Sequence, residues 1–277
     1  SPAIGADGIV YVGGGTKLYA LTSSSMGLAD SPWPKFGANN KNTHRSRLAD
    51  GLIAYYPFNG NANDEADGDN NGTVVGALLT PDRHGDANGT YQFDGVDDRI
   101  ELLHTGLPSG NANHTISAWF KTTWSSGTPK NRNIFAAGTQ ATGQYLGLYI
   151  GHTGKVGFSK WGDPNESALS YNDGRWHQVT FALEDSQARL YVDGLEIISK
   201  PYTCNTTYGT ARIGNRMDNL DAWNGSIDDV RIYNRALSAA EVEQLHLTES
   251  PDTDGDGLSD AYENGVGRYE IIQGIYT

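Results

Sequence analysis

The feature that most constrains this chain is a succession of short apolar segments separated by glycine-rich turns. Residues 52–247 hold about a dozen candidate strands, spaced roughly 8–15 residues apart, a rhythm typical of an antiparallel β-sandwich. Glycine accounts for 35 of the 277 residues, nearly twice its usual share of about 7%, and shows no G-X-Y period. Tight turns between many strands explain this excess.

Local patterns within these segments predict turns and buried faces. The Asp193-Gly194 pair between two apolar segments predicts a type I′ hairpin turn. In the strand candidate around residue 118, alternation places Ile116, Ala118 and Phe120 on one face.

One helix is predicted near the end of this region. Ser238 and Glu241 have the spacing of a capping box, and Val242 and Leu245 follow as an apolar stripe. The sequence therefore predicts an all-β sandwich closed by one short C-terminal helix.

The overall composition excludes several classes of protein. The net charge is −13 and the pI about 4.8, which argues against nucleic acid as a partner. No apolar run approaches the ~18–20 residues that cross a bilayer, so no membrane span is predicted. The single cysteine, Cys204, has no partner for an internal disulfide.

Charge and pattern divide the chain into three segments. Residues 1–46 are mildly basic, residues 50–248 hold the sandwich pattern, and residues 249–277 carry seven acidic residues against one arginine. The first residues lack the basic start and apolar stretch of a signal peptide. We therefore expect the chain to be a fragment whose partners include neighbouring domains of a larger protein.

Six motifs in the middle segment carry a family resemblance. They are IAYYPFNGNANDEADGDNNGTV, YQFDGVDDRIEL, TISAWFKT, GRWHQVTFALED, ARLYVDGLEI and GSIDDVRIYNRALSAAEVEQL, in that order. Residues 50–248 thereby resemble a laminin-G-like domain of the concanavalin A-like jelly-roll class. The resemblance implies two packed antiparallel sheets and a binding role, often for glycans, in secreted or surface proteins. Fold alone does not fix the function.

The first segment predicts a strand, a glycine turn and a second strand over residues 9–21. Its motifs SPAIGADGIVYVGGGTKLYAL and PWPKFGANNKNTHRS resemble the last repeat of a pyrroloquinoline-quinone-enzyme-like β-propeller. Only part of a four-stranded blade is present, so the resemblance implies no quinone cofactor. The alternative is an N-terminal β-arm docked on the next domain.

The last segment contains a specific calcium motif. Residues 252–263 match the twelve-residue EF-hand loop at each key position, with Gly257 at the sharp turn. The predicted ligands are Asp252, Asp254, Asp256, the Leu258 carbonyl, Asp260 and Glu263. Pro251 stands where an entering helix would end, so the segment resembles a thrombospondin type 3 repeat of a secreted bacterial protein. The alternative is a disordered acidic linker, which is compatible with ordering by calcium.

A second calcium site is implied by the laminin-G-like resemblance alone. Members of this class often hold calcium where the first loop meets the final strand, which makes Asp64, Asn71 and Asp228 the ligand candidates. Asp67 and Asp69 replace glycines of the usual loop pattern. The alternative is a solvated polar loop built from Asx-turns.

An enzyme of the glucanase type is not predicted. Such enzymes hold two carboxylates ~5–5.5 Å apart on one strand, as in Glu-x-Asp-x-x-Glu, and the sequence lacks that motif. Asp228 and Asp229 are adjacent, so strand alternation predicts that they point to opposite faces. His177 lies within a strand candidate and is interpreted as structural.

A glycan site would use exposed aromatic rings beside polar side chains. Trp119 and Trp176 lie in well-formed strand candidates and are assigned to the core. The remaining candidates for ligand binding are Trp124, Tyr149, Trp161, Arg216, Asp218 and Trp223.

These observations support one functional hypothesis and two alternatives. The hypothesis is a non-catalytic, calcium-stabilised module of a larger secreted or cell-surface bacterial protein, binding a polysaccharide. The first alternative is an adhesion or structural spacer that binds protein or nothing. The second is a glycoside hydrolase whose carboxylates converge through an unexpected topology.

We expect calcium to protect residues 249–277 from limited proteolysis. Without a cation the five loop carboxylates repel one another, and magnesium serves poorly because it prefers a tighter octahedral shell. At free calcium about 100 times the Kd, the ordered loop gains about 2.7 kcal/mol. Equal cleavage with calcium, magnesium and chelator would contradict this prediction. So would undiminished calcium protection in an Asp252→Ala, Glu263→Ala double variant.

Overall fold

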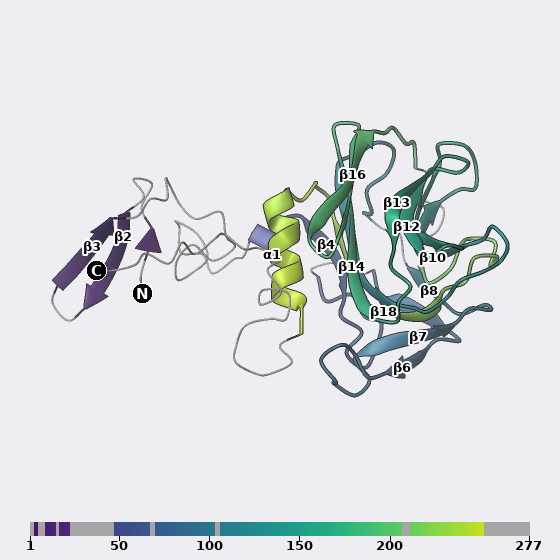
Figure 1. Ribbon diagram of the computed structural model, residues 1–277, viewed down its shortest axis with the longest axis horizontal. Coiled ribbons are helices and arrows are strands. Elements are labelled where there is room, and N and C mark those ends of the chain that lie inside the picture. Colours follow the sequence, from purple (N-terminus) through teal and green to yellow (C-terminus); the bar gives the residue numbers. More distant parts are fainter. Residues whose placement is uncertain are drawn as a thin grey trace.

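Two antiparallel β-sheets stacked face to face form the body of the protein (Figure 1). The structure is a computed structural model. It describes residues 3–4, 9–14, 17–22, 47–66, 70–102, 106–206 and 211–251. Within these ranges the two sheets, their turns and one α-helix confirm the predicted all-β sandwich.

The first sheet has seven strands in the order β13-β12-β11-β10-β17-β8-β5. Every neighbouring pair in it is antiparallel. The strands are β5 (Gly72–Val75), β8 (Arg99–Leu102), β10 (Asn131–Gly138), β11 (Tyr145–Gly151), β12 (Lys155–Ser159), β13 (Pro164–Ser170) and β17 (Ala211–Ile213).

The second sheet has eight strands, in the order β16-β15-β14-β9-β18-β7-β6 with β4 paired to β18. It is also antiparallel throughout. The strands are β4 (Leu52–Tyr56), β6 (Leu78–Thr80), β7 (Thr90–Asp94), β9 (His114–Lys121), β14 (Trp176–Glu184), β15 (Gln187–Val192), β16 (Leu195–Pro201) and β18 (Asn224–Tyr233).

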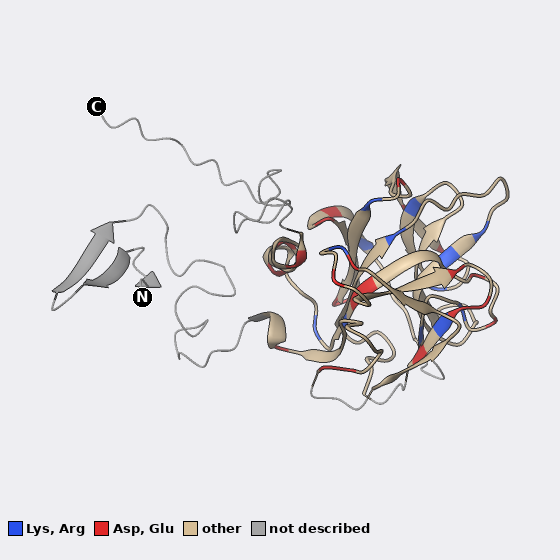
Figure 2. Ribbon diagram, turned by 90° about the horizontal axis from the view of Figure 1, so that it is seen from below, with Lys and Arg blue, Asp and Glu red and all other residues tan. Residues whose placement is uncertain are grey.

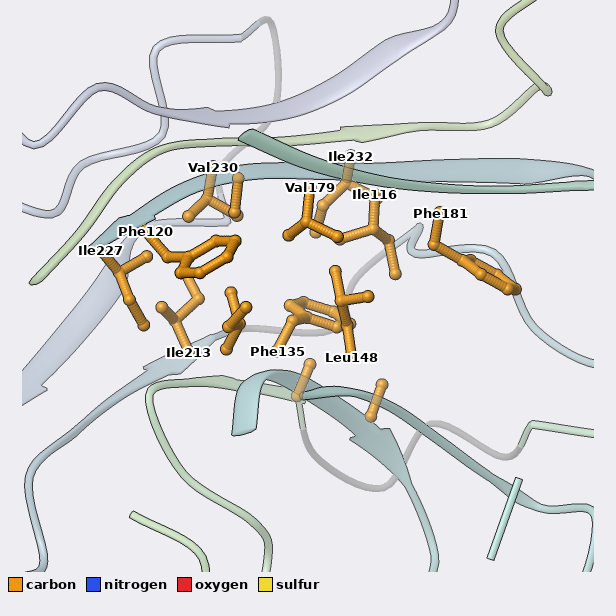
Figure 3. Close-up of a cluster of buried hydrophobic side chains, with 14 of the residues drawn as sticks. Ile116, Phe120, Phe135, Leu148, Val179, Phe181, Ile213, Ile227, Val230 and Ile232 are labelled. Carbon is orange, nitrogen blue, oxygen red and sulfur yellow. The ribbon is translucent and has the colours of Figure 1, made fainter. Parts of the chain in front are cut away.

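The core fills the space between the two sheets (Figure 3). On β9, Ile116, Ala118 and Phe120 are all buried in it, as the alternation predicts. Figure 3 shows Phe120 and Val179 of the eight-stranded sheet facing side chains of the seven-stranded sheet. The side chains labelled on the seven-stranded side are Phe135, Leu148 and Ile213.

The predicted helix is confirmed as α1 (Ala239–Glu249), which is capped by the Ser238–Glu241 box. It lies on the outer face of the eight-stranded sheet (Figure 1), where Val242 and Leu245 are buried in a second, smaller cluster. That cluster includes Ala182, Tyr191, Tyr233 and Leu237, and Leu48, within the short 3-10 helix η1 (Arg47–Ala49), packs against it.

The hairpin turns follow the local sequence. Asp193 and Gly194 have φ angles of 51° and 78°, the left-handed values that a type I′ turn requires. Asp185 and Ser186 form a second such turn, with φ angles of 47° and 67°. The prediction for Asp193-Gly194 is therefore confirmed.

The N-terminal segment contributes a small sheet of its own. Its strands β1 (Ala3–Ile4), β2 (Ile9–Gly14) and β3 (Lys17–Thr22) are antiparallel in the order β1-β2-β3. The strand–turn–strand pattern predicted here is confirmed. Among the described residues, these strands pair only with one another.

Because no described strand of the sandwich pairs with β1–β3, we expect residues 47–277 to fold without residues 1–46. The truncated protein is expected to unfold in one cooperative transition, with a melting temperature close to that of the full chain. Circular dichroism during heating measures both quantities. Loss of the cooperative transition on truncation would show that the boundary at residue 46 is wrong.

Candidate functional site

The outer face of the seven-stranded sheet is lined with tyrosines lying over glycines. On β11, Leu146 and Leu148 point into the core, so Tyr145 and Tyr149 stand on the opposite, outer side. A Cβ atom on Gly147 would lie 2.6 Å from the Tyr145 ring. Glycine at this position therefore lets the tyrosine ring lie flat along the sheet.

Arg216 organises this face from the loop between β17 and β18. Its Nε and Nη2 atoms each donate a hydrogen bond of 2.8 Å to Asp218, and its Nη1 lies 2.7 Å from Asp221 Oδ2. The guanidinium lies 5.2 Å from the centroid of the Trp161 ring. Trp161 meets Tyr145 edge to face, with 5.6 Å between the ring centroids.

A second arginine–tryptophan pair lies on the other side of Asp221. The Arg132 guanidinium, on β10, is 4.9 Å from the Trp124 ring centroid. Burial lowers the pKa of Arg132, and the attraction of Asp221 opposes that shift. Burial raises the pKa of Asp221, while Arg216 and Arg132 both pull it down. Arg132 pairs across the sheet with the core residue Ile150, so this second pair lies on the inner side of the seven-stranded sheet.

The structure brings three of the six predicted ligand-binding residues together, because Arg216 contacts both Trp161 and Asp218. Trp124 instead packs against the core and lies over Arg132. Tyr149 lies on the outer face with Tyr145 and is almost fully buried. Burial raises its pKa, and the neighbouring Glu166 adds to the shift.

The sixth residue, Trp223, requires a correction. Its side chain is 0% exposed, lies edge to face against Phe120 with 5.7 Å between centroids, and donates its indole N–H to the Ser226 carbonyl. The ring fills the core between the sheets and cannot stack on a sugar.

The sequence reasoning missed the residues that complete the site. Asp221 and Tyr145 were not singled out, although Asp221 follows Asp218 by three residues in the same loop. Tyr145 could have been found from its alternation with Leu146 on β11.

The predicted sandwich calcium set is not brought together. Asp64 and Asn71 do meet, because the Asp64 N–H donates to Asn71 Oδ1 at 2.9 Å. Asp64 Oδ1 also accepts from the Ala66 N–H at 2.9 Å, as in the Asx-turn alternative. The buried Asp228 carboxylate is instead bonded to Arg83 at 2.6 Å. Asp228 is thus ion-paired with a guanidinium rather than grouped with Asp64 and Asn71.

The prediction that Asp228 and Asp229 point to opposite faces is wrong. Both carboxylates reach one guanidinium, with Arg83 Nη1 2.6 Å from Asp228 and Nη2 2.5 Å from Asp229. The pairing register of β18 shifts between Asp228 and Arg231, and Asp229 has a φ of 45°. This bulge breaks the alternation on which the prediction rested.

Another acidic group has the geometry to hold a metal ion. Carboxylate oxygens of Asp94, Asp97 and Asp98, between β7 and β8, lie within 4.8 Å of one another. Burial raises the pKa of Asp98, and its Oδ2 accepts the Asp94 N–H at 2.8 Å. The predicted tail ligands at 252–263, and Asp67 and Asp69, lie outside the described residues.

Comparison with known protein families identifies the family to which the chain belongs. The sequence pattern of the family described as the concanavalin A-like lectin/glucanases superfamily, Laminin_G_3, matches residues 94–243. The matched region is more than half of the chain. The chain belongs to this laminin G-like family. A curated relative, adhesion G-protein coupled receptor V1 of Danio rerio, is 24% identical over 155 residues, which are 50% of this chain and 2% of the receptor.

Solved structures share the laminin G-like fold at low identity. Domain 4 of the extracellular arabinanase AbnA of Geobacillus stearothermophilus, in complex with arabinotriose, is 19% identical with a TM-score of 0.55. The match covers 70% of this chain and 97% of that one. The binding domain of Paraclostridial Mosquitocidal Protein 1 is 18% identical with a TM-score of 0.56, covering 73% and 53%.

A third similar structure is that of botulinum neurotoxin type C, whose cell entry depends on two ganglioside molecules. It is 16% identical with a TM-score of 0.54, and the match covers 72% of this chain and 51% of that one. At these identities the similarity shows the fold alone. Among the described residues, no helix has the length and apolar content that crossing a bilayer requires.

His177 of the laminin G-like sandwich has the structural role expected for it. Its Nδ1 lies 2.8 Å from Asp193 and its Nε2 3.1 Å from Asp173. Burial lowers the pKa of His177, but the hydrogen bonds and charges of the two aspartates outweigh it and raise the pKa overall. The imidazole therefore ties the 193–194 turn to the preceding loop.

A buried charge cluster fastens α1 to the eight-stranded sheet of the laminin G-like sandwich. Its members are Arg83, Arg231, Asp228, Asp229 and Glu249. Arg231 is ion-paired with Glu249, at the end of α1. Burial raises the pKa of Glu249 to about 7 and that of Asp228 to about 8, where repulsion from Asp229 contributes. Three carboxylates face two guanidiniums, so retaining one proton would balance the charge.

Stability is expected to fall as the pH rises through neutrality. The folded pKa of Glu249, about 7, exceeds its ordinary 4.5. Its contribution is therefore complete below about pH 4.5 and is lost as the pH rises through about 7. The full contribution of a pKa difference of this size is on the order of 3 kcal/mol.

Urea unfolding at roughly pH 6 and pH 8 tests this. The Glu249→Gln variant keeps the side chain's shape and removes its charge, so its unfolding free energy is expected to change less between the two pH values. Glu65→Gln, at an exposed position, is the control and is expected to behave as wild type. An unchanged pH dependence in Glu249→Gln would contradict the assignment.

Proposed function

We propose that the sandwich is a non-catalytic carbohydrate-binding module of an extracellular protein, with its ligand on the outer face of the seven-stranded sheet. The observation that carries the proposal is the contact of Trp161, Arg216 and Asp218 on that face. Glycan sites combine an aromatic platform for a sugar ring with a few fixed polar groups that orient its hydroxyls. This face offers both.

The similar proteins point in the same direction. The arabinanase domain is described with arabinotriose, and the neurotoxin depends on ganglioside molecules for cell entry. In addition, the relative from Danio rerio is an adhesion receptor. These properties belong to those proteins, and here they support a carbohydrate as the ligand and an extracellular location.

The arrangement of the carboxylates favours binding over hydrolysis. A glycosidase nucleophile needs a carboxylate oxygen free to attack the sugar. Both oxygens of Asp218 already accept hydrogen bonds from Arg216, and Oδ1 also accepts the Leu220 N–H at 3.1 Å. Asp218 is therefore held as a structural partner of Arg216.

Calcium is proposed as a stabilising ion rather than as part of the ligand site. The tail loop at 252–263 supplies the motif for one ion. The Asp94, Asp97 and Asp98 group supplies a compact set of carboxylates for another. The propeller-like and thrombospondin-like resemblances, and the secreted bacterial origin, stay predictions.

We expect Trp161→Ala to weaken polysaccharide binding about tenfold, because a stacked ring contributes ~1–2 kcal/mol. Native affinity electrophoresis in gels containing soluble polysaccharides measures the change. Trp176→Ala is the matched control, since Trp176, which the sequence assigned to the core, is a half-buried tryptophan of β14 in the other sheet.

The urea midpoint of each variant shows whether it remains folded. Trp161→Ala binding as tightly as wild type would remove the proposed site. If the wild-type protein is retarded by none of the polysaccharides, the carbohydrate-binding function itself is rejected.

A further inference from the structure

The arginine at the centre of the proposed site already uses its hydrogen-bonding fork on an acidic side chain of the protein itself. Recognition of a carboxylate normally uses two parallel N–H groups of one guanidinium. In Arg216 the Nε and Nη2 atoms already form that fork with Asp218, and Nη1 is ion-paired with Asp221. The flat face of the guanidinium lies against Trp161.

The neighbouring arginine on β17 is occupied in the same way. Arg212 Nη1 donates to the carbonyls of Arg216 and Met217 at 3.0 and 3.1 Å and to Asn219 Oδ1 at 2.8 Å. Its Nη2 lies 3.3 Å from Glu101. These bonds hold the 214–223 loop in place. Arg212 therefore uses these donors within the protein rather than on a ligand.

Acidic side chains accompany the arginines on this face. Glu101 lies beside Arg99 and Arg212, and Asp218 and Asp221 lie beside Arg216. Figure 2 shows basic and acidic positions interspersed over the sandwich rather than gathered into a basic patch. The whole chain carries −13. The electrostatic field of the protein therefore does not attract an anion.

From these contacts we infer that the site takes a neutral polysaccharide and discriminates against glycans bearing carboxylates, such as uronates and sialylated sugars. The inference rests on the proposed function and specifies its substrate class. A carboxylate bound at the fork of Arg216 would have to displace Asp218, and one bound elsewhere on this guanidinium would lie beside the charges of Asp218 and Asp221. Like charges that remain unpaired at a half-buried site cost affinity. Hydroxyl groups of a neutral sugar carry no such penalty.

The experiment compares neutral and acidic probes on the same protein. The neutral probes are arabinan and a β-glucan, and the acidic probes are polygalacturonate and sialyllactose. Isothermal titration at low and high sodium chloride gives the Kd of each. We expect a neutral probe to bind at least about tenfold more tightly than either acidic probe. We also expect the Kd of the neutral probe to be insensitive to salt. Salt screens interactions between charges, and a neutral sugar carries no charge.

Two variants test the cause of the discrimination. Asp221→Asn and Asp218→Asn each release one edge of Arg216 and remove one negative charge. Each is expected to lower the ratio of the Kd of the acidic probes to the Kd of the neutral probe about tenfold. Using both variants guards against misfolding of either one, and the urea midpoint identifies the variant that remains folded.

Each outcome tests either the preference for neutral glycans or carbohydrate binding itself. Wild-type protein that binds polygalacturonate or sialyllactose more tightly than the neutral probes overturns the inference and leaves carbohydrate binding standing. Folded variants that keep the wild-type ratio of these Kd values also overturn it, because Arg216 then does not set the selectivity. Absence of binding to every probe rejects the proposed function.

Discussion

The register of β11 decides what the outer face of the seven-stranded sheet presents. Leu146, Leu148 and Ile150 fill the core, so Tyr145 and Tyr149 must stand outside. A shift of one residue would put the tyrosines inside and expose three aliphatic side chains, which the packed core does not allow. Sheet packing thus fixes the tyrosine bed on which Trp161 rests.

The loop above this bed is held from both ends. At its far end, Trp223 is buried in the core. At its near end, a Cβ on Gly214 would lie 2.2 Å from the Phe93 ring, so glycine is required for the loop to pass. Between these points Arg216 gathers Asp218 and Asp221. A site preorganised in this way loses little conformational freedom when a ligand binds.

The opposite side of the sandwich uses buried charge for a different purpose. Arg83 joins two aspartates of β18 to the Glu249 carbonyl, and Arg231 pairs with the Glu249 carboxylate. Glu249 also accepts hydrogen bonds from Trp119 and Gln178. Burying such a cluster costs desolvation energy, but removing one member would leave another charge unpaired. The network therefore holds the end of α1 at one position on the sheet.

Local sequence patterns were enough to predict the sandwich, the Asp193-Gly194 turn and the α1 capping box, because each depends on residues close together in the chain. Strands such as β10 and β13 are harder to recognise. One opens with the polar residues 131–133, and the other begins at Pro164 on a sheet edge. Neither has the apolar alternation that marks a half-buried strand.

The candidate site was predictable only in part, because its contacts join distant segments. Trp161, Arg216 and Asp218 were identified by residue type, but their contact with Tyr145 arises from folding. Trp223 was misassigned because a tryptophan beside polar residues can turn inward as readily as outward. The pairing of Asp228 with Arg83 spans 145 positions and depends on a bulge. No local pattern reports either feature.

The most direct test is a proton–nitrogen correlation spectrum of the indole groups during titration with a neutral oligosaccharide. The chain has six tryptophans, which single substitutions assign. The account predicts that the Trp161 signal shifts on binding, while the signals of the buried Trp119 and Trp223 stay in place. A saturating ligand that leaves the Trp161 signal unmoved would contradict the account.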